Sequence, residues 1–243
     1  MKEEQLNSGT HRRGFLGMLA SGVAAIGITA IASPFKLNAQ QKAAPSQMTK
    51  SEADIWFNKL KGTHRVVYDS PRPHEIFPFA WPKVFIMSNE STGSPASDCG
   101  VVVVLRHSSI CFAFNDAMWE KYKLAEMCKV GELGGAFQAA DAATATQKRN
   151  PFFNTQPGDF KIPGIGPVPI GITDLQKDGV MFCVCNAAIN VYANVVAGKM
   201  NTTADVIIKE WKENLIPGIQ IVPSGVWALG RAQEHKCAYI FAG

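Results

Sequence analysis

Residues 179–197, GVMFCVCNAAINVYANVVA, place an apolar run directly before an alanine-rich segment. The run at 180–184 contains no polar residue, which is typical of a strand that is covered on both faces. After it, apolar side chains recur at helical spacing, namely Ala188, Val191, Tyr192 and Val195. The sequence therefore predicts a buried strand that passes into a helix at Cys185.

The rest of the chain repeats this alternation of strand and helix. The strongest strand signal is GVVVVL at 100–105, because it holds four consecutive β-branched residues. Further strands are predicted at 65–68, 219–222 and 237–241, and helices at 51–60, 81–87, 115–123, 172–177, 203–214 and 224–235. A helix in nearly every connection, without hairpin signals, favours right-handed parallel crossovers. We therefore expect an α/β fold, a Rossmann-like three-layer sandwich whose mainly parallel sheet has about five strands.

Length and composition point to one globular domain. The chain has 243 residues, of which 47% are apolar and 18% charged, so it is neither disordered nor a protein with many membrane spans. Its net charge of +4 is too weak to indicate a nucleic-acid partner. We expect a tail with a short helix at 40–62 and the α/β domain at 63–243. The stretch 131–171 is rich in Gly and Pro and has no sustained period, so it is predicted to be a mobile lid.

The first 39 residues resemble a twin-arginine export signal. Arg12 and Arg13 precede Phe15 and Leu16, and a mildly hydrophobic run follows. We expect cleavage after Ala39 and a working place in the periplasm, or otherwise outside the cytoplasm. An uncleaved signal would anchor the protein, since about 18 apolar residues just span a bilayer. Membrane contact is expected only through this segment.

Cys185 is the candidate catalytic residue. In a parallel sheet, ligands bind outside the carboxyl ends of the strands, and the first turn of a helix stabilises an anion. A thiolate at Cys185 is favoured on this ground, although a buried cysteine also serves as a small core residue. His107 and Ser224 follow the strands at 100–105 and 219–222, so we expect both at the same edge as accessory residues. Ser224 is predicted to cap a helix or contact an anion.

Cys183 offers two alternatives. It precedes Cys185 by two positions on the same expected strand face, with Cα atoms roughly 6.6 Å apart, near the limit for a disulfide. Together with Cys185 and His107, it would also make a sulfur and imidazole set suited to copper or zinc. The remaining cysteines lack the spacing of a cluster and are interpreted as core residues, with one disulfide among them left open: Cys99, Cys111, Cys128 and Cys237.

Four stretches resemble the DsrE/DsrF-like family, which includes the sulfur-relay subunits of the TusD type. They are GVVVVLRH at 100–107, GVMFCVCNAA at 179–188, PGIQIVPSGVWALGRAQEH at 217–235 and CAYIFAG at 237–243. The resemblance implies a persulfide on Cys185, no cofactor, and a symmetric trimer or hexamer. A small sulfur compound or a partner protein thiol would be its reaction partner.

The function expected from these observations is that of an exported sulfur carrier or sulfurtransferase. Cys185 would be both nucleophile and carrier, because a persulfide can pass to another thiol without a metal or cofactor. Two alternatives stay open. One is a metal-binding protein that uses Cys183, Cys185 and His107, and the other is a non-catalytic module that binds a ligand or another subunit.

Overall fold

The computed structural model describes residues 50–243, and the export signal expected at 1–39 lies outside the described residues. Five of the strands form one sheet, and the longer helices cover it. In chain order, the elements are α2 (Lys50–Phe57), β1 (His64–Ser70), α3 (Phe77–Ser91), η1 (Ala96–Asp98), β2 (Cys99–Leu105), η2 (His107–Ala113), α4 (Asp116–Lys121), α5 (Leu124–Met127), α6 (Ala142–Lys148), β3 (Lys161–Ile162), β4 (Gly166–Pro167), α7 (Ile172–Lys177), β5 (Met181–Cys185), α8 (Asn186–Met200), α9 (Ala204–Glu213), β6 (Gln220–Val222), α10 (Gly225–Glu234) and β7 (Ala238–Phe241), where η marks a 3₁₀ helix.

The main sheet has the strand order β6-β5-β2-β1-β7, and all four pairings are parallel. Strand β2 lies at its centre, and all seven of its residues are buried. The register pairs Leu105 with Val184 and Cys185 with Val222. The carboxyl ends of β2, β5 and β6 are therefore level at one edge, and the predicted parallel α/β fold is confirmed.

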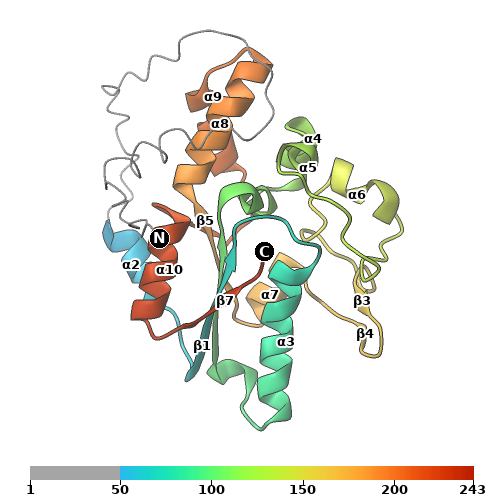
Figure 1. The fold of residues 1–243 in the computed structure, drawn as a ribbon, viewed down its shortest axis with the longest axis vertical. Helices are drawn as coiled ribbons and strands as arrows, with labels where there is room; N and C mark the ends of the chain where they lie inside the picture. Colours follow the sequence, from blue (N-terminus) through green and yellow to red (C-terminus); the bar gives the residue numbers. More distant parts are fainter. Residues whose placement is uncertain (1–49) are drawn as a thin grey trace, which may run out of the picture. The chain divides into compact units, whose positions relative to one another are not determined.

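Helices cover both faces of this sheet. Side chains of alternate residues point to opposite faces, so Val102 and Val104 pack in the cluster that includes residues of α2 and α10. Val101 and Val103 pack in the cluster that includes residues of α3 and α7. Figure 1 shows α2 and α10 on one side of the strands and α3 and α7 on the other. The molecule is thus a three-layer sandwich.

Helix α3 begins one turn before the predicted start at residue 81. Pro78 lies in its first turn, where the missing N–H has no helical partner in any case, and Pro82 lies inside the helix. The sequence prediction placed Pro82 in the first turn because an interior proline loses a backbone hydrogen bond. Phe79, which is fully buried against the sheet, explains the difference, because the extra turn carries it into the core.

The segment 131–171, which is predicted to be a mobile lid, contains regular secondary structure. It contains helix α6 and an antiparallel hairpin of β3 and β4, which the residue pattern did not predict. The rings of Phe152 and Phe160 are buried and stacked with centroids 5.1 Å apart, and Phe152 also stacks on Phe79 at 3.9 Å. These aromatic contacts build the segment into the core beneath α3.

Asn150 anchors the same segment to the end of η2. Its side chain is fully buried, and Nδ2 donates to the carbonyl oxygens of Phe112 and Phe114 at 2.8 and 2.9 Å. Its Oδ1 accepts the N–H of Phe152 at 3.1 Å. One side chain therefore satisfies three buried backbone groups, which would otherwise each lack a partner.

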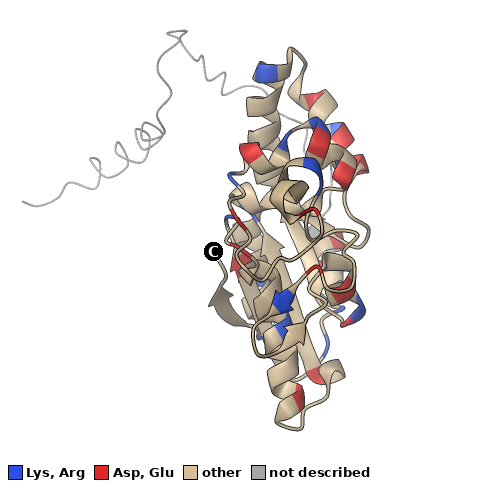
Figure 2. Cartoon of the chain, turned by 90° about the vertical axis from the view of Figure 1, so that its right-hand side faces the viewer, with Lys and Arg blue, Asp and Glu red and all other residues tan. Residues whose placement is uncertain are grey.

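Charged residues of both signs are interspersed over the face seen in Figure 2, so that face has no broad region of one sign.

Within residues 50–243, no helix combines the length and the apolar character needed to cross a membrane.

Candidate active site at the carboxyl edge of the sheet

Cys185 is the last residue of β5 and the N-cap of α8. Its Sγ accepts the backbone N–H of Ala188 at 3.3 Å, so the sulfur takes the place that a Ser or Asp oxygen has in most helix caps. The neighbouring N–H of Ala187 donates to the carbonyl oxygen of Pro223 at 3.2 Å, in the turn after β6. The predicted passage from strand to helix at Cys185 is confirmed.

Four of the other cysteines are held in the thiol form. Burial is the main cause that raises the pKa of Cys99, Cys111 and Cys183 above the ordinary value, and it raises the pKa of Cys237 to about 11. A protonated thiol is a poor nucleophile, so these side chains act as core residues at neutral pH. Cys185 is itself 6% exposed, and its sulfur lies at the helix N-terminus.

Cys183 does not share a core cluster with Cys185, contrary to the expectation that both lie on the same strand face. Cys183 is fully buried with Val102 and Val104 in the cluster that contains α10 residues, whereas Cys185 belongs to the cluster on the other side. The reason is that the chain leaves the strand at Cys185 to start α8, which turns the last side chain away.

The same placement bears on the metal-binding alternative. Cys183 is enclosed within the core, while His107 is exposed on the surface. In the part of the chain that the structure describes, His, Cys, Asp and Glu side chains form no group of three that could hold a metal ion. The set of Cys183, Cys185 and His107 that the sequence offered is therefore not brought together.

Arg106 and Asp69 form an ion pair at this edge that the sequence did not single out. The Nε and Nη2 atoms of Arg106 donate to the two carboxylate oxygens of Asp69 at 2.6 and 2.9 Å, and Tyr239 donates its hydroxyl to Asp69 at 2.8 Å. Hydrogen bonding to Asp69 is the main cause that raises the pKa of Arg106, with a smaller contribution from Cys185. The Asp69 carboxylate therefore holds Arg106 in its charged form.

A positional signal for this pair was present in the sequence. Arg106 directly follows the strongest strand, and the register places it beside Cys185, one position beyond the pair of Leu105 and Val184. The strand predicted at 65–68 extends in the structure through Asp69 to Ser70, and both of these residues are buried. A buried Asp at the end of a strand indicates a partner of opposite charge.

His107 lies at the same edge, after β2, with a left-handed φ of 48°. Its Nδ1 is 3.5 Å from the hydroxyl of Tyr192 on α8, and the two rings meet edge to face at 5.8 Å. Burial raises the pKa of Tyr192 to about 12, so its hydroxyl is neutral at physiological pH. The His107 ring is therefore turned toward α8.

Ser224 lies at the third strand end and caps α10, as predicted. Its Oγ accepts the N–H of Trp227 at 3.1 Å. The next residue, Gly225, allows this helix to start against Arg106, because a Cβ at Gly225 would come within 2.5 Å of the Arg106 Cβ. His107, Cys185 and Ser224 thus lie at the carboxyl ends of three neighbouring strands at one edge of the sheet, and Cys185 and Ser224 are both helix N-caps.

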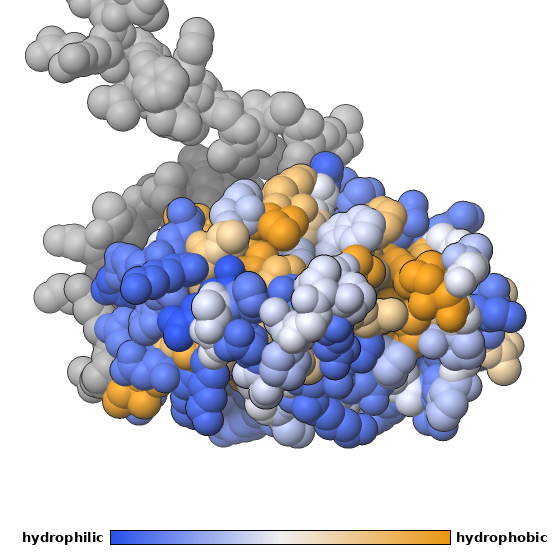
Figure 3. Space-filling model, turned by 90° about the horizontal axis from the view of Figure 1, so that it is seen from below, coloured by the Kyte–Doolittle hydropathy of each residue, from blue (hydrophilic) through white to orange (hydrophobic). Residues whose placement is uncertain are grey.

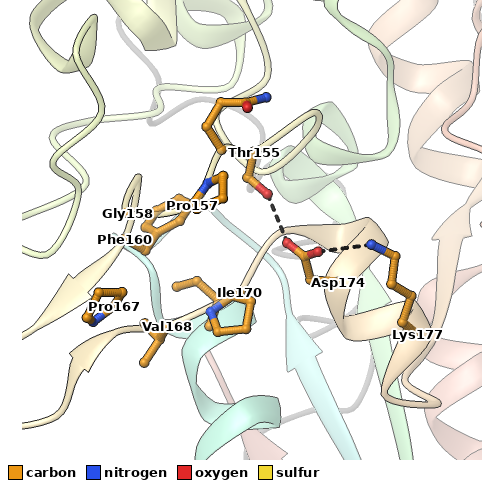
Figure 4. Close-up of a pocket in the computed structure, with 11 residues that line it drawn as sticks. Thr155, Pro157, Gly158, Phe160, Pro167, Val168, Ile170, Asp174 and Lys177 are labelled. Atoms are coloured by element: carbon orange, nitrogen blue, oxygen red, sulfur yellow. Dashed lines mark hydrogen bonds and ion pairs between the residues drawn. The ribbon is translucent and has the colours of Figure 1, made fainter.

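Two of the cavities in the described residues lie away from this edge of the sheet. One of about 460 Å³ is formed by residues 155–177, where Asp174 accepts from Thr155 at 2.9 Å and from Lys177 at 3.4 Å (Figure 4). The other, of about 940 Å³, is at the amino ends of the strands and includes Cys99 and Gly179. Seen from below, apolar residues form separate patches among hydrophilic ones (Figure 3). None of the four candidate residues lines either cavity.

Comparisons with known proteins give little beyond this geometry. No protein-family model matches the chain, and a search of curated proteins also finds no match. Among solved structures, the protein of unknown function MTH1491 from Methanobacterium thermoautotrophicum is similar, with 15% sequence identity and a TM-score of 0.36. The similarity covers 73% of this chain and 98% of that chain. A likeness at this level supports no statement on function, so the α/β assignment stands on the sheet described above.

Proposed function

We propose that the protein is a sulfur carrier that holds sulfur as a persulfide on Cys185. The observation that carries this proposal is the hydrogen bond from the Ala188 N–H to the Cys185 sulfur at the start of α8. The first turn of a helix presents backbone N–H groups that favour a negatively charged ligand, and the Cys185 sulfur occupies this position at α8. The resemblance of residues 179–188 to the persulfide-bearing stretch of DsrE/DsrF-like proteins supports the same residue.

The proposed reaction begins with a sulfane sulfur compound such as thiosulfate. The Cys185 thiolate attacks the outer sulfur, a new S–S bond forms, and sulfite leaves with the electron pair of the broken bond. In the second step, the thiolate of a partner protein attacks the outer sulfur of the persulfide, and Cys185 leaves as a thiolate. Neither step requires an oxidant, a metal or a cofactor. The carrier is proposed to assemble as a homo-oligomer, as its resemblance implies.

The test is to incubate the protein with thiosulfate or polysulfide and to measure its intact mass. We expect the gain of one sulfur atom, located by peptide mapping at Cys185. Cys185→Ser should abolish the gain while keeping the fold, because serine is itself a good N-cap and can accept the Ala188 N–H. Cys183→Ala is the matched control, since it removes the neighbouring thiol in β5 and should leave sulfur uptake unchanged.

Two results would contradict the carrier. One is uptake that persists in Cys185→Ser, which would place the reactive sulfur elsewhere. The other is the absence of any sulfur gain in wild-type protein that has been fully reduced beforehand. Melting curves of both variants show whether each is still folded, so that a loss of sulfur uptake can be distinguished from unfolding.

We also propose that the carrier works outside the cytoplasm, from the resemblance of residues 1–39 to a twin-arginine signal. Replacing Arg12 and Arg13 together by lysine should leave the precursor in the cytoplasm, as measured by cell fractionation. Replacing Lys2 by arginine, which keeps the charge of the same segment, is the control. Unchanged export of the double-lysine variant would contradict this route.

A further inference from the structure

The cavity formed by residues 155–177 has a rigid apolar part. Phe160, Val168 and Ile170 line it and are almost fully buried, with 2%, 7% and 0% of their surfaces exposed. The backbone N–H of Val168 donates to the carbonyl oxygen of Phe160 at 2.9 Å, which ties two lining segments together. Three prolines complete the apolar lining: Pro157, Pro167 and Pro169. Because a proline ring fixes φ, these segments have little freedom to close the cavity.

The opposite part of the cavity is polar. Figure 4 shows Thr155, Asp174 and Lys177 together on one side, across from Pro167 and Val168. Thr155 donates its hydroxyl to Oδ2 of Asp174 at 2.9 Å, and Lys177 donates to Oδ1 at 3.4 Å. The first contact depends on Gly171, since a Cβ there would come within 2.4 Å of the Thr155 hydroxyl and 3.0 Å of Oδ2. The Asp174 carboxylate is therefore held in a fixed position.

Both charged groups have hydrogen-bonding capacity left for a ligand. An ionised carboxylate accepts about four hydrogen bonds, and Thr155 and Lys177 account for two of those at Asp174. The Lys177 ammonium has three N–H donors, and one of them is directed at Asp174. The Lys177 side chain is 73% exposed and its contact with Asp174 is long, so it can turn toward a bound molecule at little cost. A negative and a positive group thus stand side by side at the polar end of an apolar cavity.

We propose that this cavity binds a free α-amino acid with an apolar side chain. The ligand's ammonium group binds Asp174, its carboxylate binds Lys177, and its side chain packs against Phe160 and Val168. A ligand with only one charge would meet a group of its own sign at the polar end, whereas a zwitterion satisfies both groups. The volume of about 460 Å³ lies in the range of roughly 300–1,000 Å³ that is common for small-molecule sites. This site is separate from Cys185 and does not depend on the sulfur carrier.

The experiment is equilibrium dialysis of the full chain against labelled L-phenylalanine, with three analogues as competitors. Phenethylamine lacks the carboxylate, 3-phenylpropionate lacks the ammonium group, and glycine lacks the apolar side chain. We expect the protein to retain labelled phenylalanine, and each analogue to compete about tenfold less well than unlabelled phenylalanine. No retention of phenylalanine at millimolar concentration would overturn the proposal. Competition by phenethylamine or 3-phenylpropionate that equals that of phenylalanine would overturn the zwitterion.

Matched variants locate the binding in this cavity. Asp174→Asn and Lys177→Gln should each weaken phenylalanine binding about tenfold. The controls Asp205→Asn and Lys161→Gln remove exposed charges outside the cavity and should leave it unchanged. Because the Lys177 side chain is mostly exposed, its variant keeps the fold and tests the site even where Asp174→Asn proves unstable in a melting curve. Unchanged binding in Lys177→Gln would overturn the proposal, whereas unchanged binding in Cys185→Ser is expected, since the two sites are separate.

Discussion

Arg106 and Asp69 join the ends of the two neighbouring strands β2 and β1 through a pair of hydrogen bonds, at 2.6 and 2.9 Å. Asp69 is only 2% exposed, while the Arg106 side chain keeps 28% of its surface exposed. Tyr239 on β7 donates a third hydrogen bond to the same carboxylate. One buried carboxylate thus links three strands beside the proposed nucleophile.

Removing this carboxylate should destabilise the protein strongly. In Asp69→Ala, the Arg106 guanidinium loses its partner while it stays partly buried, and we expect a loss of about 3 kcal/mol in the free energy of unfolding. Urea denaturation measures this change. Asp54→Ala removes the carboxylate of an exposed ion pair with Arg231, so its effect should be small. Equal effects of the two variants would show that Asp69 has no special role.

Asn150→Ala should also be strongly destabilising. The variant leaves the carbonyl oxygens of Phe112 and Phe114 and the N–H of Phe152 without partners in the core. We expect a loss of about 3 kcal/mol in urea denaturation. The control is Asn194→Ala, because this exposed side chain makes only a hydrogen bond within α8. A loss no larger than that of the control would mean that the segment 131–171 is held by its aromatic contacts alone.

Lys236→Gly should leave the protein equally stable or stabilise it. Lys236 directly follows His235, the C-cap of α10, and has a φ of 66°, a left-handed conformation that costs a residue with a Cβ about 1 kcal/mol. Its side chain is exposed, so little contact is lost. Lys236→Ala is the control, since alanine keeps the strained backbone and should gain nothing. A lower melting temperature for the glycine variant would contradict the prediction.

All four tyrosines should resist ionisation in the folded protein. Burial is the main cause that raises the pKa of Tyr68, Tyr122, Tyr192 and Tyr239, and Tyr192 reaches about 12. The unfolded chain loses these protons near pH 10, so stability is intact below that pH and falls as the pH rises above it. Tyrosinate absorbance against pH, in native and urea-unfolded protein, measures the difference. A tyrosine that ionises near pH 10 in native protein would contradict it.

Local patterns in the sequence were enough to predict the sheet. The β-branched run at 101–104 identified the central strand, and the apolar run before Cys185 identified its neighbour. Both strands are buried on both faces, so every residue in them is apolar, and such a run is visible in the sequence without knowledge of distant contacts. The cap Ser224 and the passage from strand to helix at Cys185 were predicted for the same reason, because both are decided by residues within one turn.

Contacts between distant residues were not predictable in this way. Asp69 and Arg106 are 37 positions apart, and each looks like an ordinary polar residue at a strand end. The aromatic rings that anchor 131–171 are irregularly spaced, so no period reveals that they converge. The face of the sheet toward which the Cys185 side chain points depends on the residue at which β5 ends. If the strand ended one residue earlier or later, the side chain at its end would point to the opposite face.

The pairing of β7 with β1 has a consequence for the order of folding. Tyr239 and Asp69 are 170 positions apart, yet they meet through neighbouring strands. When a growing chain has completed β1 and β2, the outer edge of β1 still has unpaired backbone groups and the Asp69 carboxylate lacks one of its donors. Only the arrival of β7 fills that edge. The nascent protein therefore exposes a strand that can pair with other chains until nearly all of this sequence has been synthesised.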